Sequence, residues 1–444
     1  MKRLKTAIAS QGHHDGEQED QLYLEFQHQV QVWQEGIGDD RRLELLDLGL
    51  RVLRSGDFQM RWDVAKLLPK LGSRAIAPLL QLLADEEEDE ELRWFAGSIL
   101  EKFNQPVVIA GLLEVLRTTE SEELRALGAD ILSSFGDSAL AVLQELLENP
   151  MTRELAVGAL IRIRHPEVIS ALLKVVPDEN PQVYTLALEG LSYFQDPRVV
   201  PALMMGLEHV MARVRSAAVV GLGLRCDRHS LSLVSKEQVV GKLRDRLWDF
   251  DLQVCKQAAI ALGRLATLEG AIALSAILRS HCTPKPLQQS TIQGLGLMLD
   301  SDSEVAHFAL ETLLERFLSG RYSETITLEI VKGVAQVQPQ EQRERVTSAL
   351  IEGLNLEFSP RVKGEIALSL GYLKCDREAT PKEYRALASL IELLAQEEMT
   401  VRLHAIAALK PFGDRAYQQL QYLSEQANVP RKLQDGLAIA LQEW

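Results

Sequence analysis

Histidine and cysteine offer this chain its most direct chemistry, because both ligate metals and both act in catalysis. The nine histidines are His13, His14, His28, His165, His209, His229, His281, His307 and His404. None has an i, i+4 histidine partner or a nearby Cys/His ligand, as a metal site requires. We therefore predict no metal site and interpret the histidines as residues of turns and helix surfaces.

The cysteines point to a reducing compartment and not to a nucleophile. There are four, Cys226, Cys255, Cys282 and Cys375, and none forms a CxxC pair. So few cysteines in 444 residues do not make a disulfide framework, which favours the cytoplasm. Cys282 follows His281 directly, but adjacent residues seldom point at each other. We expect a small apolar side chain at a turn there.

Nucleotide-binding and hydrolase motifs are missing from the sequence. GLGLR (221–225) and GLGLM (294–298) contain glycine, but neither reads GxGxxG or GxxxxGK[ST] after a strand. No GxSxG nucleophile motif occurs. We predict no catalytic residue and no resident cofactor.

Composition narrows the class of partner. Hydrophobic residues make up 46% and charged residues 25% of the chain, which is typical of a soluble globular protein. The formal net charge of −15 repels phosphate backbones and anionic membranes, so nucleic acid is not the expected ligand. No apolar run reaches the roughly 18 residues that a membrane span needs. We expect a cytoplasmic chain that binds other proteins.

A helix rich in small residues recurs along the chain. Examples are LRWFAGSILEKF (92–103), LRALGADILSSFG (124–136) and VRSAAVVGLG (214–223). Arg61, which lies in the similar segment MRWDVAKLLPKLG (60–72), and the arginines Arg93 and Arg125 stand 32 residues apart (93 − 61 and 125 − 93). Before each such helix lies an apolar helix, as in AIAPLLQLLAD (75–85). A period between 20 and 50 residues is the signature of a solenoid.

We therefore predict an all-α solenoid of about twelve helical pairs from about Asp39 to Gln442. Small residues of the second helix would let neighbouring helices approach closely. The predicted organisation is a disordered tail at 1–19 and one solenoid at 20–444, with a lead-in helix at 20–35. Longer turns, each opening with Cys-Asp-Arg, are predicted near 226–234 and 375–381. The repeats around 300–359 drift from the pattern.

The stretch DPRVVPALMMGLEHVMARVRSAAVVGLG (196–223) resembles a HEAT repeat of the short type found in the phycobilisome-lyase E/F group. The resemblance covers most of the chain and is looser from Pro284 to Ser359. It implies a cyanobacterial source and a role as a bilin lyase or as an assembly factor. Deoxyhypusine hydroxylase, another family with such repeats, carries a di-iron site on His-Glu dipeptides. This chain has no His-Glu dipeptide.

The recurrent arginine of the second helices has two interpretations. The residues are Arg61, Arg93, Arg125, Arg153, Arg215 and Arg402. They could form a basic stripe, or each could bridge to an acid or a helix terminus in a neighbouring repeat. We favour this ladder, with Glu91, Glu123 and Asp249 to Asp251 as partners, because stacked like charges need counter-charges. The acidic run DEEEDEE (85–91) is interpreted as a solvated turn that favours the next helix dipole.

Aromatic residues supply the candidate binding site. Trp62 and Trp94 follow the repeat arginine directly, and Phe95 joins them. Exposed aromatic residues in register mark a partner or ligand surface on the concave face. The alternative is that they pack against the lead-in helix, which contains Leu22, Tyr23, Phe26 and Trp33. Both readings stay open at this point.

The sequence thus predicts a non-catalytic protein-binding scaffold, adaptor or assembly factor. The resemblance implies phycobiliprotein subunits or a photosynthetic complex as partners. The alternative is a bilin lyase, isomerase or chromophore chaperone acting on phycobiliproteins. A bilin needs an arginine, an acid and stacking aromatic rings together, and Trp62, Asp63, Arg93, Trp94 and Phe95 provide that mixture.

Overall fold

The computed structural model describes residues 16–34, 40–224, 234–280, 282–300, 303–373 and 381–444. Within these ranges the chain forms α-helices, short 3₁₀ segments and turns, and it forms no strand. The chain divides into two compact units, Met1–Phe194 and Gln195–Trp444. Each unit is described by itself.

The helices of the first unit are α1 (Gly16–Gln34), α2 (Asp40–Ser55), α3 (Phe58–Leu67), α4 (Ile76–Ala84), α5 (Glu90–Leu100), α6 (Pro106–Thr118), α7 (Glu122–Ser134), α8 (Leu140–Leu146), α9 (Pro150–Leu160), α10 (Glu167–Lys174) and α11 (Pro181–Leu191). Those of the second unit are α12 (Val199–Gly206), α13 (Ala212–Leu224), α14 (Lys236–Asp245), α15 (Leu252–Leu265), α16 (Leu268–Arg279), α17 (Lys285–Leu297), α18 (Glu304–Leu318), α19 (Glu324–Val334), α20 (Gln340–Gly353), α21 (Pro360–Tyr372), α22 (Pro381–Glu392), α23 (Met399–Leu409), α24 (Asp414–Ser424) and α25 (Arg431–Gln442).

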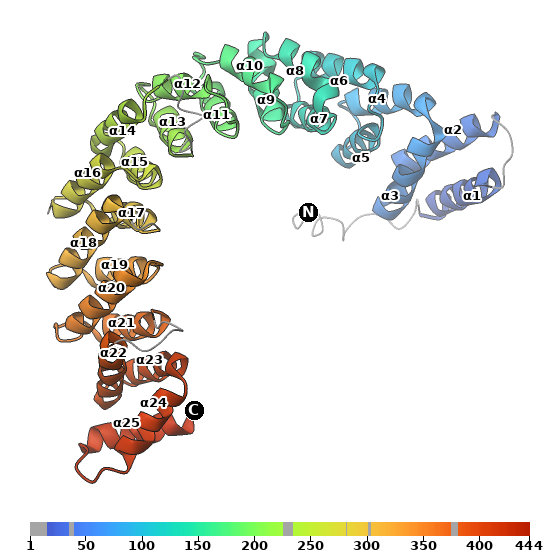
Figure 1. Cartoon of the computed structure of the whole chain (residues 1–444). Helices are drawn as coiled ribbons and strands as arrows, with labels where there is room; N and C mark the ends of the chain where they lie inside the picture. Colours follow the sequence, from blue (N-terminus) through green and yellow to red (C-terminus); the bar gives the residue numbers. More distant parts are fainter. Residues whose placement is uncertain (1–15, 35–39, 225–233, 281, 301–302, 374–380) are drawn as a thin grey trace. The chain divides into compact units, whose positions relative to one another are not determined.

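The predicted all-α solenoid is confirmed. Each even-numbered helix from α2 onward packs against the odd-numbered helix that follows it, so α2 to α25 make twelve pairs. From α3 to α11 in the first unit and from α13 to α23 in the second, each odd-numbered helix contacts the next odd-numbered helix, and these helices form one face while the even-numbered helices form the other (Figure 1). A pair cannot bury its apolar face alone, and stacking on the next pair completes the core.

The lead-in helix α1 begins at Gly16, four residues before the predicted 20–35 (20 − 16). Residues 16–19, which were predicted as tail, belong to this helix in the structure. Residues 1–15 and most of the two predicted longer turns, with Cys226 and Cys375, lie outside the described residues.

Among the described residues, seven of the twelve second helices begin at a polar N-cap with a side-chain hydrogen bond. The capping side chains, each accepting a hydrogen bond from a backbone N–H of the first turn, include Asp57, Asp89, Ser121, Asn149, Asn180, Asp251 and Ser359. Such a cap contributes about 1 kcal/mol to helix stability. The short turn within each of these pairs is therefore specified by local sequence, and it fixes where the second helix starts.

Small residues set the distance between second helices, as predicted. A Cβ on Gly263 of α15 would lie 2.4 Å from the carbonyl oxygen of Gly294 on α17. In the first unit, the hollow at Gly111 of α6 is filled by Leu80 of α4, whose Cδ1 would be 2.3 Å from an added Cβ. Glycine thus admits either a backbone or a leucine from the neighbouring helix.

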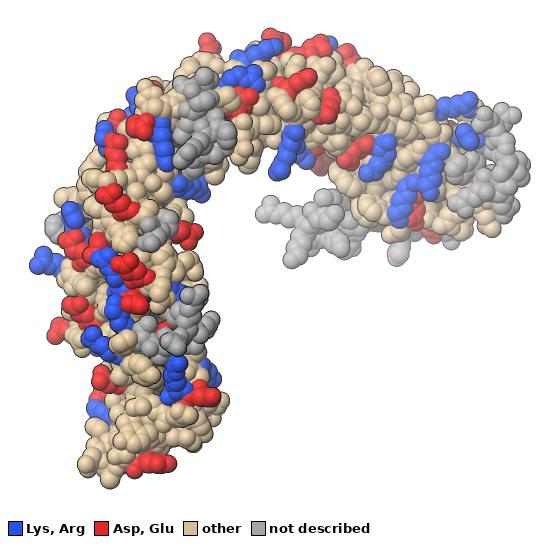
Figure 2. Space-filling view, viewed as in Figure 1, with Lys and Arg blue, Asp and Glu red and all other residues tan. Residues whose placement is uncertain are grey.

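Ion pairs connect neighbouring pairs on the surface. In the second unit, Arg244 pairs with Glu269 at 2.6 Å and Arg279 with Glu315 at 3.1 Å. Figure 2 shows acidic and basic side chains interspersed along this unit. Both partners of these pairs are about half exposed, so each pair contributes less than about 1 kcal/mol.

We expect Gly263→Ala to destabilise the second unit by about 1–3 kcal/mol, because the added methyl group collides with the backbone of α17. Amide hydrogen exchange of α15 and α17 measures the loss. Gly296→Ala is the matched control. Its Cβ meets nothing within 4 Å, and alanine is the better helix former by up to about 1 kcal/mol. Equal exchange rates in the two variants would contradict the close-contact role of Gly263.

Candidate functional site

Trp62 on α3 and Trp94 on α5 lie at equivalent positions of adjacent helices in the first unit. They are 41% and 42% exposed. Phe95 is fully buried, so the prediction that it joins them at the surface is wrong. Its ring lies beneath Trp94 in an edge-to-face contact, with centroids 5.1 Å apart and planes at 79°. Phe95 supports the surface but cannot touch a partner.

Phe58 is a surface aromatic residue that the sequence analysis missed. It is 48% exposed and stacks on Trp62, with centroids 6.2 Å apart and planes at 15°. It also contacts Phe95 at 5.4 Å between centroids. The i, i+4 spacing of Phe58 and Trp62 could have revealed the pair. We call Phe58, Trp62 and Trp94 the aromatic surface. The buried ring of Phe95 contacts both Phe58 on α3 and Trp94 on α5, and so connects the parts of the surface on the two helices.

Asp63 connects α3 to the lead-in helix. The Tyr23 hydroxyl donates to Asp63 Oδ2 at 2.7 Å, and Lys66 Nζ donates to Oδ1 at 3.1 Å. The hydrogen bond from Tyr23 is the main cause that lowers the pKa of Asp63, and the bond from Lys66 adds to it. Burial, followed by this hydrogen bond, raises the pKa of Tyr23. Asp63 is thus held within the fold by α1 and its own helix.

The lead-in helix packs mainly on α2, not on the tryptophans. Phe26 and Val30 of α1 are buried, and the Phe26 ring would be 3.2 Å from a Cβ on Gly49 of α2. Trp62 and Trp94 keep about two fifths of their surface exposed. Of the two readings left open by the sequence, this packing favours the exposed surface.

Arg93 lies beside Trp94 and is half-buried. Among the described residues, its Nε has no hydrogen-bond partner. Its positive charge helps to lower the pKa of Glu123, after a backbone hydrogen bond and one from the Ser121 hydroxyl. It also helps to lower the pKa of Glu86, for which a hydrogen bond with Thr119 is the main cause.

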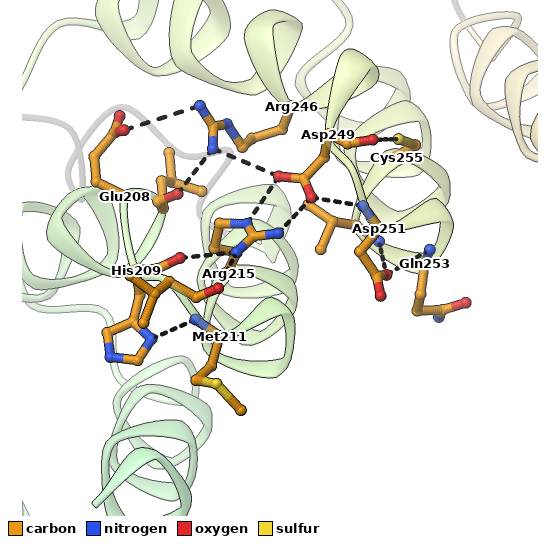
Figure 3. Close-up of polar contacts among 12 residues, drawn as sticks. Glu208, His209, Met211, Arg215, Arg246, Asp249, Asp251, Gln253 and Cys255 are labelled. Atoms are coloured by element: carbon orange, nitrogen blue, oxygen red, sulfur yellow. Dashed lines mark hydrogen bonds and ion pairs between the residues drawn. The ribbon is translucent and has the colours of Figure 1, made fainter. Parts of the chain in front are cut away.

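Three of the other repeat arginines, Arg61, Arg153 and Arg215, form the predicted ladder. Arg215 is the fullest case (Figure 3): Nη1 donates at 2.8 Å to the carbonyls of both His209 and Val210, and Nε donates at 2.8 Å to Asp249 Oδ2. It therefore binds carbonyls of the preceding turn and bridges to the next pair. Arg61 makes the same bridge to Asp89 and Glu91, and Arg153 makes it to Asp178 while also donating to the Leu147 carbonyl. Arg125 and Arg402 donate to the Thr119 and Glu397 carbonyls, which lie in the turns of their own pairs.

The bridge at Asp249 is buried. The side chains of Arg215 and Asp249 are 10% and 3% exposed. Burial alone would raise the pKa of Asp249, but bonds from Arg215 and from the Asp251 backbone, with the charges of Arg215 and Arg246, lower it overall. Cys255 takes the arginine position of the next pair, and its thiol donates to the Asp249 carbonyl at 3.2 Å. Burial raises the pKa of this thiol, which suits a structural residue.

Ion pairs with arginines explain three of the seven acids in the run at 85–91. Asp89 and Glu91 pair with Arg61, and Glu88 pairs with Arg54 at 3.0 Å. Asp89 is also the N-cap of α5. The run therefore forms part of the turn and of the start of α5, and it also faces solvent.

A second group of exposed apolar residues, also missed, lies on two turns of the second unit. Trp248 and Phe250 stand before α15, with Trp248 70% exposed and Phe250 fully exposed. Val210, 87% exposed, lies on the turn before α13. The Arg215–Asp249 bridge holds these two turns together. The sequence signal is WDFD (248–251), two aromatic residues in a polar turn.

Neither metal ligation nor membrane spanning is indicated by the described part of the chain. No group of three or more His, Cys, Asp or Glu side chains there could hold a metal ion. Over the same residues, every helix is too short or too polar to cross a bilayer.

A family model described as HEAT repeats matches residues 45–133, 109–184, 139–223 and 169–263. The chain therefore contains HEAT repeats, as the sequence analysis expected. The finer resemblance to the phycobilisome-lyase group, and with it a cyanobacterial source, stays a prediction. No curated protein matches the sequence.

Solved structures of karyopherins share the fold. Yeast importin-β (Kap95p), in a structure concerned with its binding to RanGDP, aligns over 98% of this chain and 65% of its own, with 16% identity and a TM-score of 0.60. An importin-β crystal structure aligns over 89% of this chain and 60% of its own, with 13% identity and a TM-score of 0.57. Kap121p bound to Ste12p aligns over 92% of this chain and 50% of its own, with 14% identity and a TM-score of 0.58. The chain spans less than two thirds of the length of each.

We expect Asp249→Asn to destabilise α13 and α15 by about 3 kcal/mol at neutral pH, because Arg215 loses its buried counter-charge. Because folding lowers the pKa of Asp249, the ionised carboxylate stabilises the fold fully above the pKa of about 3.9 that it has in the unfolded chain. That contribution is lost as the pH falls through the folded pKa. The difference between wild type and variant, measured by hydrogen exchange, should therefore shrink below about pH 4.

Arg279→Ala provides the control for this experiment. It breaks the exposed pair with Glu315 and should cost less than about 1 kcal/mol. A cost for Asp249→Asn as small as this control, or one that persists unchanged in acid, would contradict the buried bridge.

Proposed function

We propose that this HEAT-repeat chain is a non-catalytic scaffold that binds a protein partner through the aromatic surface of its first unit. The observation that carries the proposal is the exposure of Phe58, Trp62 and Trp94 on two adjacent second helices. Large aromatic side chains of this kind are enriched in binding hot spots, because they bury much apolar area at low entropic cost.

The surface is preorganised for binding. Trp94 rests on the buried ring of Phe95, which also contacts Phe58. Trp62 is held between Phe58 and Lys66, whose Nζ lies 5.5 Å from the indole centroid. Binding of a partner would therefore cost little side-chain conformational entropy at these residues.

The fold supports a binding role by analogy. Kap95p and Kap121p, which share this architecture at low identity, are described in complexes with RanGDP and with Ste12p. A stack of helical pairs offers an extended face that side chains can adapt to many partners. Within that role, we propose an adaptor or assembly factor acting in the cytoplasm, with phycobiliprotein subunits or a photosynthetic complex as the first partners to examine.

The test is capture of partners from the native cell lysate, with cross-linking and mass spectrometry. We expect Trp62→Ala/Trp94→Ala to reduce the recovery of the enriched partner at least about tenfold, since hot-spot truncations cost about 2 kcal/mol or more. Tyr422→Ala is the control. Tyr422 is 60% exposed and lies on α24 of the second unit. Recovery that is equal in both variants would overturn the assignment of this surface.

A bilin lyase or chromophore chaperone is the second candidate. Arg93, next to the exposed Trp94 in the sequence, favours it, because a bilin carries propionates and a conjugated system that stacks on aromatic rings. Two observations argue against bilin binding here. Phe95 is buried, so it cannot stack on a bilin, and the Asp63 carboxylate is already bonded to Tyr23 and Lys66.

Bilin binding has its own spectroscopic test. If the chain binds bilins here, mixing it with phycocyanobilin should change the visible absorption spectrum of the bilin. Trp94→Ala should reduce that change. A spectrum that stays the same as in buffer would dismiss the candidate while leaving the scaffold proposal intact.

A further inference from the structure

The helices α3 and α5 carry the same tryptophan in different surroundings. Trp62 and Trp94 stand 32 residues apart (94 − 62), each directly after the repeat arginine. One turn later, α3 has Lys66 and α5 has Ser98. One turn earlier, α3 has Phe58 and α5 has Glu90.

Lys66 shows what the ring of Trp62 binds. Its Nζ lies 5.5 Å from the centroid of the indole and donates to Asp63 at 3.1 Å. An ammonium over an indole face with a carboxylate beside it is a cation–π site with a counter-charge. On α3 the chain supplies that cation itself.

On α5 the cation is missing and Phe95 takes the position of Asp63, but a carboxylate, Glu90, stands at the position of Phe58. Within the described residues, no Lys or Arg lies over Trp94, and Ser98 at the position of Lys66 cannot provide one. Glu90 lies one turn before Trp94, on the same side of the helix. Glu122 takes the position of Glu90 on the neighbouring helix α7.

These two carboxylates differ from the other acids of the region. Asp89 and Glu91 are neutralised by Arg61. Glu90 and Glu122 are exposed, and among the described residues neither has an ion-pair partner. Glu90, one helical turn from the open indole of Trp94, therefore carries a negative charge that no ion pair among the described residues balances, and Glu122 does so on the next helix.

We propose that Trp94, with Glu90 and Glu122, binds a Lys or Arg side chain from a basic segment of the protein partner. The partner's cation takes the place over Trp94 that Lys66 takes over Trp62, and the two carboxylates attract it. The apolar rings of Phe58 and Trp62 contact the neighbouring residues of the same segment. This inference rests on the proposed function, because it names the chemistry of the partner at that surface.

The probe is a short fluorescein-labelled peptide of alternating Arg and Ala, and its binding to the full chain is measured by fluorescence anisotropy. We expect it to bind more tightly than the same peptide with Gln in place of Arg, and to weaken as salt is added. Trp94→Leu keeps an apolar side chain but removes the ring face. It should raise Kd about threefold to fivefold, as expected for an exposed cation–π contact.

Two further variants examine the charges. Glu90→Gln/Glu122→Gln should raise Kd about threefold, as for exposed ion pairs. The control Glu114→Gln/Glu167→Gln removes the same charge from exposed positions on α6 and α10, where Glu167 is also in a first helical turn. It should leave Kd unchanged.

Ser98→Lys tests the position of the cation directly. It places an ammonium on α5 at the position that Lys66 has on α3, and this internal cation should compete with the peptide and raise Kd as much as Trp94→Leu does. Circular dichroism confirms that each variant is folded. Unchanged binding in both Trp94→Leu and Ser98→Lys would overturn the inference, as would equal binding of the Arg and Gln peptides.

These outcomes are separable from those of the scaffold proposal. If Trp62→Ala/Trp94→Ala abolishes capture of the partner but the Arg peptide is not preferred, the surface binds a partner of other chemistry. The basic-segment inference then fails while the scaffold proposal stands. If capture survives that double substitution, the scaffold assignment itself fails.

Discussion

Burial of apolar surface between successive helical pairs is the constraint on which the rest of the structure depends. A single pair of short helices has too little core to be stable, so each pair completes its core against the next. That requirement explains the small residues at the contacts between helices of successive pairs. At Gly263 a side chain would collide with the backbone of α17, and at Gly111 it would displace Leu80. The same contacts leave the position after the repeat arginine free, because it points away from both neighbours.

The polar ladder follows from the same geometry. The turn within each pair ends one helix and starts another, so unpaired carbonyls and N–H groups gather there. Arg215 binds two of these carbonyls and also reaches Asp249 of the next pair, while Asp251 caps the helix that follows. The arginine positions that make these bonds are therefore mainly structural, in line with the ladder interpretation of the sequence. Where Cys255 replaces the arginine, its thiol makes the equivalent bond to the Asp249 carbonyl.

In the proposed function, the side chains that the packing leaves exposed bind the partner. Trp62 and Trp94 occupy the same repeat position, and the structural ladder uses the arginine just before Trp62. A partner would meet rings that are already held in place by Phe58 and Phe95. This separation between a repeated structural residue and a variable neighbour explains how one repeat architecture can acquire different partners.

The sequence by itself determined the fold. Its 32-residue spacing and its apolar and small-residue helices are local signals, and they predicted about twelve helical pairs and favoured the arginine ladder, while they left the surroundings of Trp62 and Trp94 open. Only the tertiary structure decided the environment of single side chains. Phe95 is one residue from Trp94 yet faces the core, Phe58 completes the surface, and Asp63 is bonded to Tyr23, which is 40 residues away. Such facts depend on the angle at which a helix meets its neighbour. A repeat pattern read along one chain does not contain that angle, because packing between helices sets it.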